Sequence, residues 1–93
     1  MDRNESVRHF ENLNRLLKVI REKGVIPFTP EEENHFQESL NANELGIAFD
    51  LICWKIEQAG LPISSEVYDL IVDTGSRMEC SPADWQNLKA FVR

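Results

Sequence analysis

The sequence contains few cysteines, glycines and prolines, and each shortage excludes a class of protein. Its 93 residues include two cysteines, four glycines and four prolines. Cys53 and Cys80 are too few and too far apart for a disulfide scaffold, and no CxxC pair indicates a metal or redox site. The low glycine and proline content excludes collagen-like and low-complexity chains. We therefore expect an ordinary folded chain with two reduced thiols.

Long apolar runs are also missing. No stretch approaches the roughly 20 residues that a membrane span requires, and the first 21 residues carry charges throughout, unlike a secretory signal. The chain is short for two separate cores, which usually need about 100 residues or more each. The sequence thus predicts one domain over residues 1–93 that is cytoplasmic and has no membrane partner.

Catalytic and ligand-binding motifs are equally scarce. His9 and His35 have no second ligand at metal spacing, and neither cysteine has a neighbouring histidine. The sequence contains no glycine-rich phosphate loop, no GxSxG and no HExxH motif. We expect no enzyme, no cofactor and no metal. The weaker alternative is a small enzyme that uses His35 with nearby acids in a cleft.

Charge is unevenly distributed along the chain. The net charge of −6 divides into +2 for residues 1–24, −9 for residues 25–75 and +1 for residues 76–93. Lys55 is the single base of the middle segment. An acidic chain is a poor partner for nucleic acid, whose phosphates attract clusters of Lys and Arg. The charge favours a basic protein as partner, although acids also simply keep proteins soluble.

Hydrophobic periodicity and capping residues predict a small all-α bundle of about five helices. The first helix covers about residues 4–23, with apolar residues every three or four positions at Val7, Phe10, Leu13, Leu17 and Ile20. Gly24 is expected to end it in the left-handed conformation. The second helix begins after Thr29, where Pro30 and Glu32 complete a capping box. Glu31, Glu32 and Glu33 suit the positive end of this helix, which explains them as well as a partner would.

The three remaining helices follow from the same signals. Asn41 or Asn43 is expected to cap a third helix that reaches Ala59 before Gly60 and Pro62 end it. Ser64 caps the fourth helix, and Ser81 with Pro82 begins the fifth. The predicted core takes its side chains mainly from the third to fifth helices, at Leu45, Ala48, Phe49, Ile52, Ile56, Val67, Leu70, Ile71, Thr74, Met78, Trp85 and Leu88.

Two exposed patches are candidate protein-binding surfaces. The first is a stripe of three acids on the fourth helix, at Glu66, Asp69 and Asp73. The second lies on the outer side of the third helix, at Asp50, Trp54 and Glu57. There Trp54 is either a core residue of a central helix that is apolar nearly all round or an exposed aromatic anchor for a partner.

The last 50 residues resemble the MafI-type immunity proteins of bacterial polymorphic-toxin and contact-dependent inhibition systems. The matching positions are Leu45-Gly46-x-Ala48, Asp50, Ile52-Cys53, Leu61-Pro62-Ile63-Ser64, Glu66-x-Tyr68-x-x-Ile71, Gly75, Met78 and Trp85-x-x-Leu88-x-x-x-Val92. Most are caps and core positions. Trp54 departs from the pattern, in which a polar residue is expected, and the N-terminal half matches only as a helical pair.

The resemblance implies a small cytoplasmic antitoxin that binds and neutralises the C-terminal domain of a cognate toxin. Such domains are often nucleases with basic clefts, so an acidic surface could compete there with substrate phosphates. The alternative is an acidic helical adaptor or regulatory subunit with no toxin partner. An upstream gene ending in a variable toxin domain would favour the first hypothesis.

Overall fold

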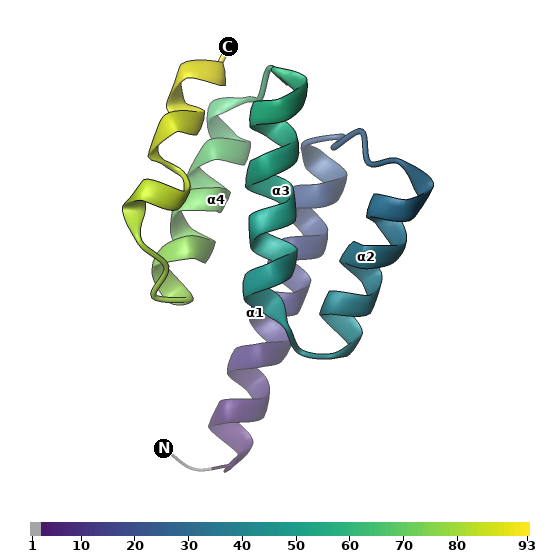
Figure 1. Ribbon diagram of the computed structural model, residues 1–93. Coiled ribbons are helices and arrows are strands. Elements are labelled where there is room, and N and C mark those ends of the chain that lie inside the picture. Colours follow the sequence, from purple (N-terminus) through teal and green to yellow (C-terminus); the bar gives the residue numbers. More distant parts are fainter. Residues whose placement is uncertain (1–2) are drawn as a thin grey trace.

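The computed structural model describes residues 3–93, with side chains from Val7 onward, so that Met1 and Asp2 of the predicted domain lie outside it. The fold is all-α, as predicted (Figure 1). Its elements are α1 (Arg3–Lys23), α2 (Pro30–Asn41), α3 (Leu45–Ala59), α4 (Ser65–Arg77) and two 3₁₀ helices, η1 (Pro82–Asp84) and η2 (Gln86–Phe91). No described helix is both long enough and apolar enough to cross a membrane.

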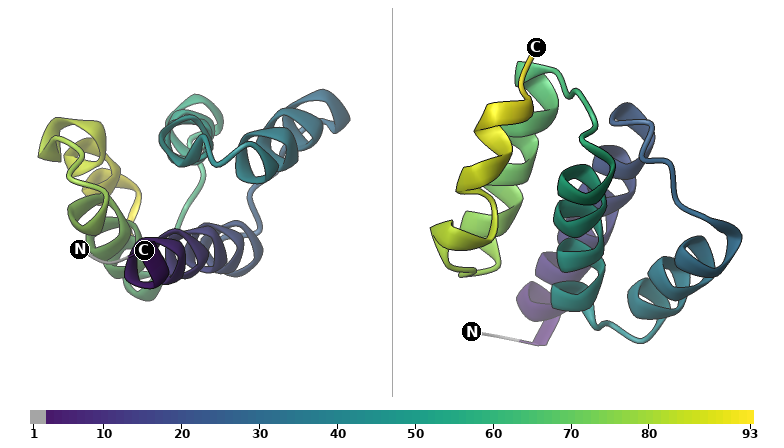
Figure 2. Two further views of the ribbon diagram at one scale, coloured as in Figure 1. Left: turned by 90° about the horizontal axis from the view of Figure 1, so that it is seen from below. Right: turned by 45° about the horizontal axis from the view of Figure 1, so that its top comes forward.

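The helices form two layers, which Figure 2 shows in its view from below. One layer contains α1 and α4, which pack against each other, and the other contains α2, α3 and the C-terminal 3₁₀ segment. α3 lies between α2 and the 3₁₀ segment, and it also packs on α1. One side of α3 therefore faces away from the rest of the bundle.

The buried side chains form one hydrophobic cluster to which every helix except η1 contributes. The predicted inward residues of α3 are buried, at Leu45, Ala48, Phe49, Ile52 and Ile56. Those of α4 and the C-terminal segment are buried or half-buried. Val7 and Phe10 are the exceptions, because the first turns of α1 extend past the other helices (Figure 1) and leave these residues 49% and 44% exposed.

Two predicted N-terminal caps are confirmed. The Thr29 hydroxyl accepts a hydrogen bond from the backbone N–H of Glu32 at 3.2 Å, and the Glu32 carboxylate accepts one from the N–H of Thr29 at 2.8 Å. At the start of α4, the Ser64 hydroxyl accepts a bond from the N–H of Val67 at 3.1 Å. Each cap satisfies backbone donors that the first helical turn leaves unpaired.

All four α-helices end in the same motif. In each, a residue with positive φ follows the last turn, and the next N–H bonds back to the carbonyl five residues earlier, as in a Schellman motif. The four left-handed residues are Val25, Asn43, Gly60 and Glu79. Glycine, which adopts this conformation at little cost, occupies just one of the four positions.

Two predictions about these ends are wrong. The left-handed residue after α1 is Val25, not Gly24, and Gly24 is required because a Cβ there would lie 2.9 Å from the Ile20 carbonyl oxygen. Neither asparagine caps α3, because Asn41 is the last residue of α2 and the positive φ of 60° places Asn43 in the closing motif of α2. α3 begins after Glu44, which makes no side-chain cap.

The fifth helical segment is 3₁₀ rather than α. Ser81 caps it, since its hydroxyl accepts from the N–H of Ala83, and Trp85 then interrupts it with φ −130°. The Trp85 indole packs on Gly75 of α4, where an added Cβ would lie 2.5 Å from the ring, and meets Phe49 edge-on at a centroid distance of 6.2 Å. Gly75 therefore makes room for the segment that follows α4.

Candidate protein-binding surfaces

The acidic stripe on α4 is largely neutralised within the chain. The Glu66 carboxylate lies 2.8 Å from Lys23 Nζ of α1, which raises the pKa of Lys23 through that hydrogen bond. Asp73 pairs at 3.0 Å with Arg77 one turn later on the same helix. Asp69 is exposed, and no salt bridge joins it to any side chain that the structure describes. Two of the three predicted contact acids thus already have a basic neighbour.

No salt bridge joins the acids of the predicted patch on α3 to any side chain that the structure describes. Asp50, Trp54 and Glu57 are all exposed and lie on successive turns of the helix, with the Trp54 side chain 47% exposed. Ile47, 41% exposed, and the half-buried Leu51 extend the apolar part of this face toward the start of α3. Trp54 therefore lies on the surface, and its interpretation as a core residue is wrong.

Asp84 of η1 joins these residues. The pKa of Asp50 is raised. The chief cause is that neighbouring atoms partly bury its carboxylate and so disfavour the charged form, and the second is the nearby Asp84 carboxylate. We call Asp50, Trp54, Glu57 and Asp84 the α3 surface. Sequence reasoning missed Asp84, because nothing in the sequence around it indicates that its carboxylate comes near Asp50.

The acids of this surface affect the pKa values of the two cysteines, which lie near it. Burial raises the pKa of Cys53 to about 12, with further contributions from Asp50, Asp84, Cys80 and Glu57. The pKa of the half-buried Cys80 is also raised, by burial first and then by Asp84 and Asp50. Both are free thiols. At neutral pH they are protonated, and a protonated thiol is a poor nucleophile.

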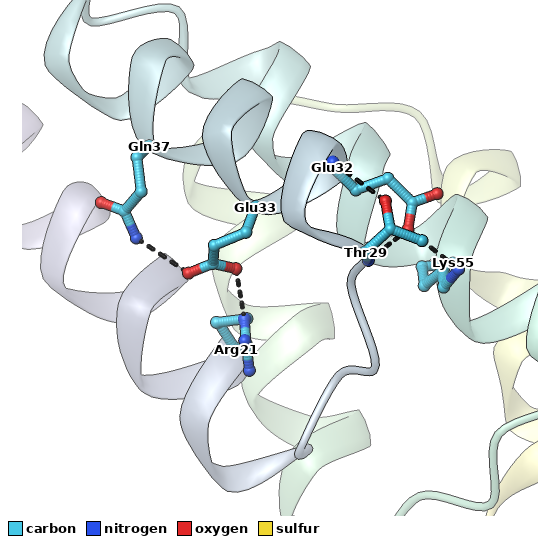
Figure 3. A network of polar contacts seen from close by, with 6 residues as sticks. All are labelled: Arg21, Thr29, Glu32, Glu33, Gln37 and Lys55. Atoms are coloured by element: carbon cyan, nitrogen blue, oxygen red, sulfur yellow. Dashed lines mark hydrogen bonds and ion pairs between the residues drawn. The ribbon is translucent and has the colours of Figure 1, made fainter.

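Lys55 makes its contacts away from these acids. Its ammonium nitrogen lies 2.9 Å from Glu32 of α2, at the capping box that Figure 3 shows. The same nitrogen lies 5.6 Å from the centre of the Trp54 ring, within the range of a cation–π interaction. Lys55 is 8% exposed. The single base of the acidic middle segment thus links α3 to α2 and supports one side of the Trp54 indole.

The glutamates at the start of α2 have structural roles. The pKa of Glu32 is lowered, first by the Thr29 N–H and then by Lys55. Glu33 pairs with Arg21 of α1 at 2.9 Å and accepts a bond from Gln37 (Figure 3). These contacts give Glu32 and Glu33 a role within the chain, so two of the three acids need no binding partner to explain them.

The position of His35 gives no support to the predicted catalytic cleft. His35 is exposed on α2 and lines neither the hollow between α1 and α2 nor the larger groove at the start of α3. Among the described residues, no three His, Cys, Asp or Glu side chains form a group that could hold a metal ion.

Comparison with known proteins gives no relative, since the chain matches no family model, no curated protein and no solved structure. The resemblance to MafI-type immunity proteins therefore stays a prediction from the sequence.

Proposed function

We propose that the protein is an immunity protein that binds a basic toxin domain and neutralises it in the cytoplasm of the cell that makes both. The observation that carries the proposal is the α3 surface, where an exposed tryptophan lies among acids that form no salt bridge with any described residue. Tryptophan is among the residues that dominate binding energy at protein interfaces.

The charge of an acid on this surface destabilises the folded chain, and this supports a role for the surface in binding. The raised pKa of Asp50 means that its negative charge is destabilised in the folded chain. A smaller part of this cost is repulsion from Asp84, which a basic partner would offset. The partner's Lys or Arg side chains would be attracted by Asp50, Glu57 and Asp84 together. Trp54 would supply apolar contact area at the centre.

The toxin domain is, on this proposal, a nuclease or another protein with a basic substrate site. An acidic surface placed over such a site competes with substrate phosphates, because both are attracted by the same cationic side chains. No catalytic group of the immunity protein is required for this inhibition.

Co-expression tests the proposal directly. The toxin domain encoded immediately upstream would be produced with and without this protein, and growth and co-purification measured. We expect growth rescue and a stable complex that weakens as salt increases. A toxic upstream domain that the protein neither binds nor neutralises would overturn the proposal, and so would the absence of any toxin gene there, which would leave the adaptor hypothesis.

A further inference from the structure

A groove lies at the end of the bundle where α1 extends past the other helices. Its volume is about 530 Å³, and its mainly apolar lining comes from three parts of the chain. These are Phe10 and Leu13 of α1, Leu45 and Gly46 of α3, and Met78 and Cys80 after α4. The groove involves none of the residues of the α3 surface.

Two apolar side chains beside the groove are exposed in the part of the chain that the structure describes. Val7 and Phe10 continue the buried face of α1 that Leu13, Leu17 and Ile20 form further along. Leu13, Leu17 and Ile20 are buried, whereas Val7 and Phe10 are exposed. The apolar stripe of an amphipathic helix normally faces a core, so an exposed part of it is a candidate contact for a partner.

Gly46 indicates that the groove accepts a close neighbour. A Cβ added at Gly46 would meet no atom within 4 Å, and its φ is not in the left-handed region. Packing and backbone conformation within the chain therefore do not require glycine at this position. Glycine lowers helix stability relative to alanine by up to about 1 kcal/mol. Because Gly46 has no side chain, the wall of the groove is open at this position.

The charges around the groove suit a second copy of the chain. Arg77, which also pairs with Asp73 of its own chain, and Glu79 carry opposite charges on its lining. Such a balanced rim is self-complementary, because a two-fold axis can set the arginine of one copy against the glutamate of the other. The α3 surface, which carries acids alone, would repel a copy of itself.

We propose that two copies associate about a two-fold axis, with Val7 and Phe10 of each copy packed in the groove of the other. Each chain then supplies both the apolar helix end and the groove that receives it, which is how an isologous interface works. The proposal does not rest on toxin binding. It explains three features that the single chain leaves without a role: the exposed end of α1, the open groove and the bare Gly46.

Sedimentation equilibrium of the purified chain over a range of concentrations tests the dimer. We expect a species of twice the 10.8 kDa chain mass. Phe10→Asp should raise the dimer dissociation constant by about 100-fold, because it places a carboxylate in an apolar interface. Val25→Asp is the matched control, since it makes the same charge change at an exposed apolar residue on the other end of α1, and it should leave the constant unchanged. Circular dichroism checks the fold of each variant.

Gly46→Leu provides a second, independent variant. In the single chain the new side chain enters open space, so the midpoint of thermal unfolding at low concentration should stay the same or rise. In the dimer it fills the groove, so the dissociation constant should rise by about tenfold or more. A chain that stays monomeric at all concentrations would overturn the proposal. So would a dimer that tolerates both Phe10→Asp and Gly46→Leu, or one that Val25→Asp weakens as much as Phe10→Asp does.

Discussion

The acids on α4 and those of the α3 surface differ in what surrounds them, although both occupy exposed helical positions. On α4, Glu66 and Asp73 lie within 3.0 Å of Lys23 and Arg77. On α3, Asp50 has Asp84 as its charged neighbour, and its pKa is raised rather than lowered. Formal charge is thus similar in the two places, but the charge available to a partner is greater on α3.

This difference shows that an acidic stripe in a sequence is a weak sign of a binding surface. Salt bridges on an exposed face contribute little to stability, commonly less than about 1 kcal/mol, yet they reduce the potential that a partner would meet. Acids that form no salt bridge lower stability slightly, and the negative potential that they present to a partner is not reduced. We therefore expect the α3 surface to dominate binding and the α4 stripe to act mainly at long range.

The largest effect is expected from charge reversal on the α3 surface. Asp50→Lys combined with Glu57→Lys should weaken the complex with the basic toxin domain by about 100-fold, because two attractive contacts beside Trp54 become repulsive. Isothermal titration calorimetry measures the affinity, and circular dichroism checks that the variant folds. Unchanged affinity in a folded variant would place the contact elsewhere.

Stability should respond most strongly at the contact between Gly75 of α4 and Trp85, the residue that follows η1. Gly75→Ala puts a methyl group 2.5 Å from the Trp85 ring, so the free energy of unfolding in urea should fall by about 3 kcal/mol. Gly46→Ala is the control, because its Cβ meets nothing and it should not destabilise the chain. Equal effects of the two alanines would mean that Trp85 does not depend on Gly75.

Local signals predicted most of the fold. The caps at Thr29 and Ser64, the stop at Gly60 and the apolar periodicity of α3 and α4 each depend on residues within a few positions of one another, which the sequence displays directly. The predictions for Gly24 and Asn43 were wrong because glycine and asparagine each occur at more than one position near a helix end. The hydrogen bonds that close the helix decide which position each residue takes.

The site was harder to predict because its electrostatics depend on distant residues. Lys23 and Glu66 are 43 positions apart, and Asp50 and Asp84 are 34 positions apart. Helical spacing placed each acid on the correct outer face. It could not indicate which acids would find a base on another helix.

Charge reversal on the α4 stripe is a matched test of the comparison. Asp69→Lys combined with Asp73→Lys changes the net charge by the same amount as the α3 double variant. We expect the association rate to fall by about tenfold at low salt, with little change in the dissociation rate, because distant charges steer encounter more than they hold a complex. Surface plasmon resonance at two salt concentrations separates the two rates. A loss of affinity as large as that of the α3 variant would make the α4 stripe the contact surface.

Removing one charge at a time should change stability in opposite directions on the two surfaces. Since the pKa of Asp50 is raised in the folded chain, ionised Asp50 is destabilising, and Asp50→Asn should increase the free energy of unfolding at pH 7 by no more than about 0.5 kcal/mol, given solvent screening. Asp73→Asn removes the pair with Arg77 and should decrease it by a similar amount.

The pH dependence of the Asp50 effect identifies its origin. A raised acid pKa means that the protonated group favours the folded state. Wild-type stability therefore matches that of Asp50→Asn below the ordinary aspartate pKa and falls behind as pH rises toward the raised value. Urea unfolding of both proteins at pH 7 and at about pH 3 measures this, since an ordinary aspartate is mostly protonated at the lower pH. A gain that persists at low pH would reflect packing of the amide rather than relief of charge, and the two acidic surfaces would then not differ in the way their surroundings indicate.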